Sequence, residues 1–548
     1  MENDTPCTVC TVKGYIENSN LSGEECPSPQ FDACDPCPGC REISSIDAQI
    51  AQARVLLQNL YLKRCDAKLI RNKHHDQLVR RLPVEVVSRI FIHCLPHIPP
   101  PPFSLSEYDG RGKREARPER RKLVGLFLAA ICQRWRQIAF ATPHLWTVAR
   151  VKISRQTIAL DAKLTSEWLR RSGRLPLWLD VYEDEEQTNS LRRWRRHGGK
   201  PPVKFDPTPI FDALNPHLSR VEVLEVHTES KYLALLHGEA PILSQLYLSL
   251  NSWEVESSST ALRFAGTAPS PQRVILREAP SSAVCINWAS LTHFEALSLT
   301  LDESLLLLQS SPLLTYFNLG SISSTSTPTF ATSSTSVVTH PQTTLAALHT
   351  LIVTTSESEL LFPHLAAPAL QTLHTTGELP VVSSFITRSN CSLQCLTIKA
   401  LPATPEQFIE VLEKTPLLTE LDAWLGQIHD SFFERLAATA RIPEYTLVED
   451  AFLPRLRVLT LGGVPYFRLS SIPPIFSLGN AGGNDVDFVY RPLSTFELTL
   501  SFYLNPADAP HAGYTHTLID EEVKKRLKEL IKGGKKISIA SKTQRTLL

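Results

Sequence analysis

Cysteines at metal-ligand spacing are concentrated near the N-terminus of the chain. Seven of the twelve cysteines lie within the first 65 residues, in an arrangement that includes Cys7-x-x-Cys10 and Cys34-x-x-Cys37-x-x-Cys40. Two thiolates separated by a short turn can share a tetrahedral zinc ion, so Cys7, Cys10, Cys34 and Cys37 are weak zinc candidates. The alternative is a reduced, flexible arm, because this Pro- and Ser-rich stretch has few apolar residues to pack beside a metal. We predict a disordered tail over residues 1–42, with no bound metal or other cofactor.

Residue types that serve catalysis lack the spacing that an active site requires. The sequence has no Gly-x-Ser-x-Gly nucleophile elbow, no Gly-x-x-x-x-Gly-Lys phosphate loop and no His-Glu-x-x-His zinc motif. His74, His75 and Asp76 are adjacent on a predicted helix and point in different directions, so they do not converge on one ligand. We therefore predict that the protein is not an enzyme.

Charge and hydropathy narrow the class of partner. Lys+Arg and Asp+Glu balance at 56 each, which makes nucleic acid an improbable partner for the chain as a whole. The basic cluster within residues 111–122 is either a nuclear-import signal or a solvated loop. The start of the chain is acidic and polar, and no apolar run reaches the roughly 18–20 residues that span a bilayer. We predict an intracellular protein, cytoplasmic and/or nuclear, without membrane association. The longest apolar run, Leu123–Ile131, is predicted to be a buried helix segment.

A helical period begins at Ile43. Apolar residues recur at steps of three and four at Ile43, Ile46, Ile50, Ala53, Leu57 and Leu60. This stripe predicts an amphipathic, coiled-coil-like helix over residues 43–79. The helix either pairs with a partner helix or packs on its own chain, and we favour the second arrangement.

Residues 80–150 contain a series of helix signals. Leu82-Pro83 is a natural helix start, because proline in the first turn forfeits no hydrogen bond. The segment from Val84 to Leu95 ends before Pro96, and a polar, Pro- and Arg-rich insertion follows at residues 97–122. Apolar helix resumes from Leu123 through Ile138. Pro143 ends that helix and leads into Pro-x-Leu-Trp.

This ordered series resembles an F-box. Five separated elements occur in the expected order, from the Leu-Pro start through Ile-Phe and Ile-Cys-x-x-Trp to Pro-x-Leu-Trp. The insertion at 97–122 is much longer than the connection in a typical F-box. The residues that match the motif are Leu82, Pro83, Ile90, Phe91, Cys132, Trp135, Pro143 and Trp146.

A repeat of the form aliphatic-x-x-aliphatic-x-aliphatic follows over residues 211–518. Its middle position is occupied by Leu224, Leu246, Leu297, Phe317, Leu351, Leu373, Leu396, Leu421, Leu459 and Leu498. Most intervals fall in or near the 20–29 residues typical of leucine-rich repeats. We predict a solenoid of parallel strands and helices, whose units stack to share one core. The overall fold class is α/β (α+β overall), with a small helical F-box-like domain before the solenoid.

Connecting and terminal segments complete the predicted organisation. Residues 151–210 are expected to hold a helix near 160–169, a strand near 175–181 and a polar loop. Residues 519–548 are expected to hold a capping helix from Asp520 and a tail, with Gly533 as the stop signal.

The combined pattern is similar to the F-box receptor subunits of cullin-based ubiquitin ligases, in particular a large fungal set. The resemblance implies that the F-box residues dock on a Skp-type adaptor held by a cullin scaffold, and that the repeats capture an unknown target protein. Leu82 and Pro83 are the favoured contacts, whereas Ile90, Trp135 and Trp146 are equally well explained as core. On the exposed strand positions, the candidate target-binding residues are Tyr247, His374, Lys399, Glu420, Asp422 and Trp424.

Two alternatives stay open at this point. One is a repeat scaffold that no longer binds the adaptor because of the 97–122 insertion. The other is a zinc-dependent nucleic-acid-binding protein that uses the Cys-rich N-terminus. The sequence identifies neither the target nor any modification that it must carry.

Overall fold

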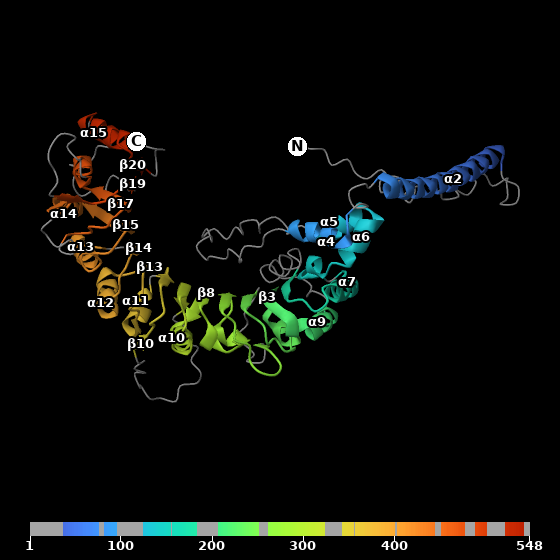
Figure 1. Ribbon diagram of the computed structural model, residues 1–548, viewed down its shortest axis with the longest axis horizontal. Coiled ribbons are helices and arrows are strands. Elements are labelled where there is room, and N and C mark those ends of the chain that lie inside the picture. The colour runs from blue at the N-terminus through green and yellow to red at the C-terminus, as the bar shows by residue number, and fades with distance from the viewer. Residues whose placement is uncertain are drawn as a thin grey trace. The chain divides into compact units, whose positions relative to one another are not determined.

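The computed structural model describes two compact units (Figure 1). The first holds the described residues up to 145 and the second holds those from 146 onward. The described ranges are 37–75, 82–95, 124–154, 156–183, 206–250, 261–323, 342–355, 357–400, 403–443, 451–476, 488–500 and 521–541. Cys7, Cys10, Cys34, the 97–122 insertion and its basic cluster lie outside them.

The first unit is built from helices. They are α2 (Pro38–His75), α4 (Val84–His93), α5 (Val124–Ile131) and α6 (Gln133–Phe140). Pro83 precedes α4 and its carbonyl accepts hydrogen bonds from the first-turn amides of Val86 and Val87. The sequence predicted one helix from Leu123 through Ile138, and this was wrong. Cys132 has an extended backbone and its Sγ accepts from the Trp135 amide, so it caps a new helix and separates α5 from α6.

α2 is long and largely exposed. The residues of the predicted stripe, such as Ile43 and Leu60, are exposed, so packing of this helix on its own chain is not found among the described residues. Val55, Leu56 and Leu62 lie outside the stripe and are exposed as well, so α2 carries apolar residues on more than one face. None of the described helices, α2 included, combines the length and apolarity needed to cross a bilayer.

The second unit is organised around one sheet of 14 parallel strands whose neighbours follow chain order. The strands are β1 (Val148–Ile153), β2 (Leu177–Glu183), β3 (Val221–Thr228), β4 (Gln245–Leu250), β6 (Arg273–Arg277), β8 (His293–Thr300), β9 (Tyr316–Ser323), β11 (Thr350–Val353), β13 (Thr372–Thr376), β14 (Cys395–Ala400), β15 (Glu420–His429), β17 (Val458–Tyr466), β19 (Thr495–Leu500) and β20 (Lys536–Ser541). The α/β class predicted from the sequence is therefore confirmed.

Helices connect many of these strands and lie along one side of them (Figure 1). They are α7 (Ile158–Arg171), α9 (Thr208–Leu214), α10 (Leu301–Ser310), α11 (Ser358–Leu361), α12 (Leu379–Ser389), α13 (Pro405–Glu413), α14 (Asp430–Ala438) and α15 (Glu521–Lys532). Side-chain caps begin two of them: Thr300 and Thr404 each form a capping box, with Glu303 and Gln407 respectively. Short strands form three further pairs: β5 (Leu262–Arg263) with β7 (Val284–Cys285), β10 (Thr343–Thr344) with β12 (Leu365–Ala366), and β16 (Arg441–Pro443) with β18 (Phe488–Tyr490).

One row of side chains forms the spine of the core between the sheet and these helices. Register pairs Leu351 with Leu373, Leu373 with Leu396, and Leu396 with Leu421, and all four are buried. Stacking of Phe294 on Phe317, with ring centroids 5.6 Å apart, continues the row. Because each strand lends only a few leucines, neighbouring strands must stack to keep these side chains from water.

The register corrects parts of the predicted repeat. Phe294, not Leu297, pairs with Phe317, and Phe496, not Leu498, pairs with Leu459. The true pattern at β8, Leu291-x-x-Phe294-x-Ala296, was hidden because alanine occupies its third position. Four strands (β1, β2, β6 and β20) also belong to the sheet but not to the predicted repeat. Because β1, β2 and β20 lie outside residues 211–518, the sheet extends beyond that range in both directions.

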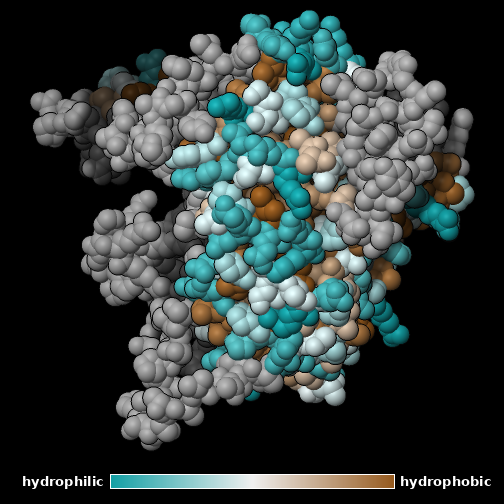
Figure 2. Space-filling model, turned by 90° about the vertical axis from the view of Figure 1, so that its left-hand side faces the viewer, coloured by the Kyte–Doolittle hydropathy of each residue, from teal (hydrophilic) through white to brown (hydrophobic). Residues whose placement is uncertain are grey.

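The helical side of the second unit is a mixed surface. Figure 2 views the side at which α13 and α14 lie, and hydrophilic side chains predominate on its described part, with apolar residues scattered among them. Scattered apolar side chains are normal for a surface exposed to water.

Candidate functional site

Two of the residues matched to the F-box motif are packed against each other. Phe91 of α4 is 1% exposed, and its ring lies 4.9 Å from that of half-buried Trp135 on α6. Nearby, the Thr142 hydroxyl donates to Ile138 O and contacts Ser88 Oγ at 3.0 Å, which joins the end of α6 to α4. Phe91 and Trp135 therefore hold the small helical domain together.

The remaining residues that match the motif differ in how far they are exposed to solvent. Pro83 is exposed and Leu82 is half-buried at the start of α4, whereas Cys132 and Pro143 are half-buried within the domain. Ile90 is 47% exposed. Trp146 belongs to the second unit, where it is fully buried against Trp168 with ring centroids 4.7 Å apart. Trp146 is thus a core residue of the second unit.

Large apolar side chains are exposed on both α4 and α5. We call this set the docking face: Val84, Val86, Ile90, Leu126, Phe127 and Ile131. Phe127 is 69% exposed, the highest value in the set. Val86 with Ile90, and Phe127 with Ile131, are each four residues apart and so lie on one side of their helix. The prediction that the run Leu123–Ile131 is buried was therefore wrong for Leu126, Phe127 and Ile131.

The sequence did hold a signal for this face. α5 is apolar around its whole circumference, since Gly125, Leu128 and Ala129 face the domain core while Phe127 and Ile131 do not. An eight-residue helix of this kind cannot bury all of its sides in a domain of three short helices. Apolar residues in excess of what the domain can cover are typical of an interaction surface.

The sheet of the second unit has a face turned away from the buried leucine row, which we call the second face. Side chains alternate between the two faces along each strand, so residues one position after the buried row belong to the second face. In strand order, these are Arg150, Asp180, Glu225, Tyr247, Ile275, Glu295, Asn318, Ile352, His374, Thr397, Asp422, Thr460, Glu497 and Ser538.

A group on β2 and β3 could provide ligands for a cation. Asp180, Glu225 and His227 are buried, and their donor atoms all lie within 4.8 Å of one another. The two carboxylates already have partners: Arg150 Nε lies 3.0 Å from Asp180 Oδ2, and Trp178 Nε1 donates to Glu225 Oε1 at 2.6 Å. The carboxylates are therefore compensated within the protein, as is usual for buried charges.

Tyr247 is buried rather than exposed, which corrects its expected place on an accessible surface. Only 5% of the residue is accessible. Its ring lies 4.7 Å from that of His227, and the Arg277 guanidinium carbon lies 5.9 Å from the same ring. Tyr247 is therefore part of the aromatic and charged packing on β3, β4 and β6.

The other five candidate target-binding residues come together on β13, β14 and β15. His374 and Asp422 occupy one row of the second face, and Lys399 pairs in register with Trp424 in the row two residues further on. Lys399 and Glu420 are exposed, whereas His374, Asp422 and Trp424 are half-buried. The sequence pattern thus correctly brought these five residues to one face.

Burial shifts two of these groups toward their neutral forms. The pKa of Asp422 is raised chiefly by burial, while a hydrogen bond from Trp424 and the charges of Lys399 and His374 act in the opposite direction. Burial also lowers the pKa of His374. Asp422 Oδ1 has no hydrogen-bond partner. This oxygen is itself buried, so the missing partner adds to the cost of ionising Asp422.

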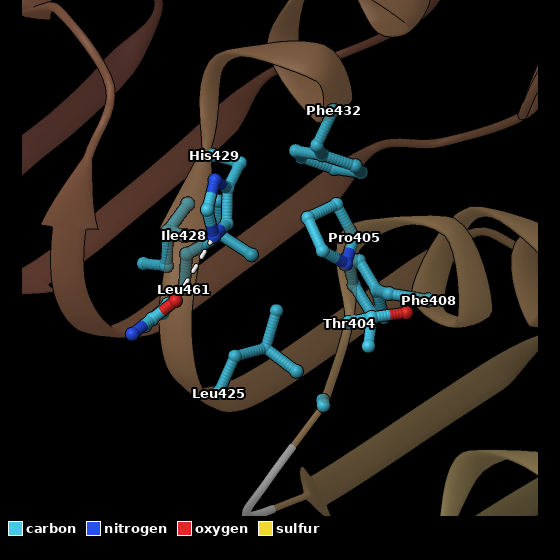
Figure 3. A pocket seen from close by; sticks show the side chains of 10 residues that line it. Thr404, Pro405, Phe408, Leu425, Ile428, His429, Phe432 and Leu461 are labelled. Atoms are coloured by element: carbon cyan, nitrogen blue, oxygen red, sulfur yellow. Dashed lines mark hydrogen bonds between the residues drawn. The ribbon is translucent and has the colours of Figure 1, made fainter.

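Figure 3 shows a small pocket next to the end of β15. Its ten lining residues are Ala403, Thr404, Pro405, Phe408, Leu425, Gln427, Ile428, His429, Phe432 and Leu461. His429 is the one titratable residue among them, and its Nε2 lies 3.2 Å from Gln427 Oε1. The Thr404 hydroxyl in this lining is engaged as a helix cap, since it accepts from the Gln407 amide.

The described cysteines give a partial view of the predicted zinc candidates. Cys37 and Cys40 lie at the start of α2, where the Cys40 amide donates to Cys37 Sγ at 3.4 Å. Cys37 thus acts as a helix cap. The other three candidates lie outside the described residues.

Comparison with known proteins does not identify a family for this chain. No family model matches the chain, and no curated protein matches it. A functional assignment must therefore come from the two surfaces above.

Proposed function

We propose that this protein is an F-box-like substrate receptor, which docks on a Skp-type adaptor of a cullin ubiquitin ligase and recruits a target protein through a leucine-rich-repeat-like solenoid. The observation that carries the proposal is the docking face on α4 and α5, with Phe127 at its most exposed point. In the proposal the protein binds and positions its partners and catalyses no reaction.

The docking face supports an adaptor partner over a scaffold that has lost adaptor binding. Exposed apolar side chains such as Phe127 and Ile131 lower solubility unless a partner covers them. Burial of an aromatic and several aliphatic side chains at the centre of an interface supplies most of its affinity. In this proposal Ile90, Val86 and the α5 residues make the contacts, while Phe91 and Trp135 hold α4 against α6.

The sheet supports the repeat assignment. All 14 strands of the main sheet are parallel and ordered as in the sequence, so each unit contacts only its neighbours, as repeat units do. Buried leucines recur in register at Leu351, Leu373, Leu396 and Leu421. The second face would then present side chains to the target.

Co-purification of the full chain with a Skp-type adaptor tests this proposal. We expect the wild-type chain to retain the adaptor and the Phe127→Glu variant to lose it, because a carboxylate would be buried without a partner. Leu306→Glu is the matched control, since Leu306 is 63% exposed on α10 in the second unit. Circular dichroism establishes that both variants fold. A wild-type chain that fails to retain the adaptor would overturn the proposal and favour the scaffold alternative.

A further inference from the structure

Acidic side chains of the second face differ in their partners between its first half (β1 to β9) and its second half (β11 to β20). In the first half, Asp180 lies 3.0 Å from Arg150, and Glu295 lies 3.2 Å from Arg273. In the second half, three acidic residues (Glu420, Asp422 and Glu497) have no ion-pair partner among the described residues. Glu420 and Glu497 are exposed to solvent, and Glu420 shares a hydrogen bond with Cys395. Burial raises the pKa of Asp422, which favours its neutral form, so the exposed negative charge of this half comes from Glu420 and Glu497.

Trp424 lies on the same face as these acidic residues, and its ring leans toward β17. Its indole covers Gly462, its register partner, so closely that an added Cβ at position 462 would lie 2.6 Å from Trp424 Cδ2. The ring therefore leans away from Lys399, which pairs with Trp424 from the other side on β14. Around the ring, Thr460 and Thr499 are the next second-face residues on β17 and β19, and both are small.

Asp422 supports this position of the ring. It precedes Trp424 by two residues, so both side chains project from the same face of β15. A hydrogen bond from the Trp424 side chain reaches Asp422 and lowers its pKa against the effect of burial. Glu420 lies two residues earlier on the same face and is exposed. The strand thus presents two carboxylates and an aromatic ring in a line.

We propose that Trp424, together with Glu420, Asp422 and Glu497, forms a binding site for an arginine or lysine side chain of the target protein. This inference rests on the proposed function, in which the second face recruits the target. A guanidinium or ammonium group gains from lying on an indole face, and its charge complements the carboxylates. The exposed carboxylates of Glu420 and Glu497 disfavour nucleic acid, because they would repel its phosphates.

Three cationic or titratable residues flank this site, on β13, β14 and β20. Lys399 lies on the β14 side, opposite the direction in which the indole leans. His374 lies one strand further away, and burial favours its neutral form. Lys536 of β20 pairs in register with Thr495 and is exposed on the same face, on the far side of β19 from Trp424.

A phage-displayed library of random peptides, selected on the full-length protein, tests the site. We expect the selected peptides to share an arginine or lysine. A synthetic copy with citrulline in place of the key arginine removes the charge and keeps the shape, and it should bind roughly tenfold more weakly or worse. Trp424→Ala and Glu420→Gln should weaken binding of the arginine peptide. Glu406→Gln, an exposed carboxylate on α13, is the matched control and should leave binding unchanged.

Each contrary result overturns the inference. These results are a selection that yields no peptide, peptides without a shared basic residue, equal affinity for the citrulline copy, and equal affinity for the Trp424→Ala variant. Retention of the Skp-type adaptor is measured in parallel on the same variants, and Trp424→Ala should retain it. Loss of the adaptor from the wild type with intact peptide binding would refute the adaptor role alone.

Discussion

Phe91 and Trp135 form an aromatic pair across α4 and α6, with ring centroids 4.9 Å apart and planes inclined at 49°. Both residues match the motif that indicates adaptor binding, yet their contacts are internal. Ile90, the immediate neighbour of Phe91, faces outward. Adjacent positions on one helix thus differ: Phe91 faces the core, and Ile90 is free to contact a partner in the proposed complex.

The buried aromatic pair and the exposed Ile90 predict different effects for two variants, one on stability and one on adaptor binding. Trp135→Ala should destabilise the small helical domain by roughly 2–3 kcal/mol, because it removes a half-buried aromatic partner of Phe91. Ile90→Ala should change stability by less than about 1 kcal/mol and should weaken adaptor binding directly. Hydrogen exchange of the α4 amides reports the first effect and adaptor titration reports the second. Faster α4 exchange in Ile90→Ala than in Trp135→Ala would contradict the assignment.

Gly462 offers a way to move Trp424 without changing it. In the Gly462→Ala variant the methyl group would occupy the space of the indole, so the ring must shift from its place over β17. We expect the intrinsic tryptophan fluorescence to change and the basic peptide to bind several-fold more weakly. Gly39→Ala is the control, because an added Cβ there meets no atom within 4 Å. Unchanged peptide affinity in Gly462→Ala would mean that the position of the ring does not determine binding.

Structural features of this protein were predictable from the sequence where a regular pattern of buried side chains determines them. Buried leucines recur at near-regular intervals because adjacent strands must stack, so the strands at Leu351, Leu373, Leu396 and Leu421 were predictable. Strand β6 was not, since Pro271 stands where the pattern expects an aliphatic residue. The break between α5 and α6 was also hidden, because Cys132 is a weak cap whose backbone geometry local sequence does not determine.

In the candidate sites too, local alternation was predictable, whereas burial that depends on distant strands or helices was not. Period-two alternation placed Asp422 and Trp424 on one face of β15, and the structure agrees. Alternation alone could not predict the burial of Tyr247, which depends on side chains from β3 and β6 that meet only in the fold. The docking face was missed for a similar reason, because exposure of Phe127 depends on how few helices the domain has to cover α5.

Asp422 predicts a pH-dependent difference in stability. Burial raises its pKa, so the folded protein holds this proton more tightly than the unfolded chain does. The ionised carboxylate therefore costs stability, and this cost grows as the pH rises from about 4, the ordinary aspartate value, through the raised pKa. Asp422→Asn should be more stable than the wild type at pH 7, with the two converging in acid. Urea unfolding of both proteins at several pH values measures this, and a destabilised Asp422→Asn at pH 7 would contradict it.

Arg491 is a buried cation that joins two segments of the second unit. Its guanidinium donates to the carbonyls of Leu436, Thr439, Phe452 and Leu453, at distances of 2.7–3.1 Å. Burial lowers its pKa to about 10, which leaves it charged at neutral pH. The residue therefore satisfies carbonyls that would otherwise be buried without donors, and no other side chain has as many donors in one plane.

Arg491→Met should therefore destabilise the protein by at least about 3 kcal/mol, because it leaves several buried carbonyls without a hydrogen-bond donor. Arg491→Lys should recover only part of this loss, since an ammonium group has three donors and a different geometry. Arg435→Met is the matched control: Arg435 is exposed on α14 and pairs with Glu413 at 3.1 Å, a surface contact worth less than about 1 kcal/mol. Urea unfolding compares the three variants. Equal stability of Arg491→Met and Arg435→Met would show that these carbonyls find other donors. Arg491 would then not be required for the stability of this region.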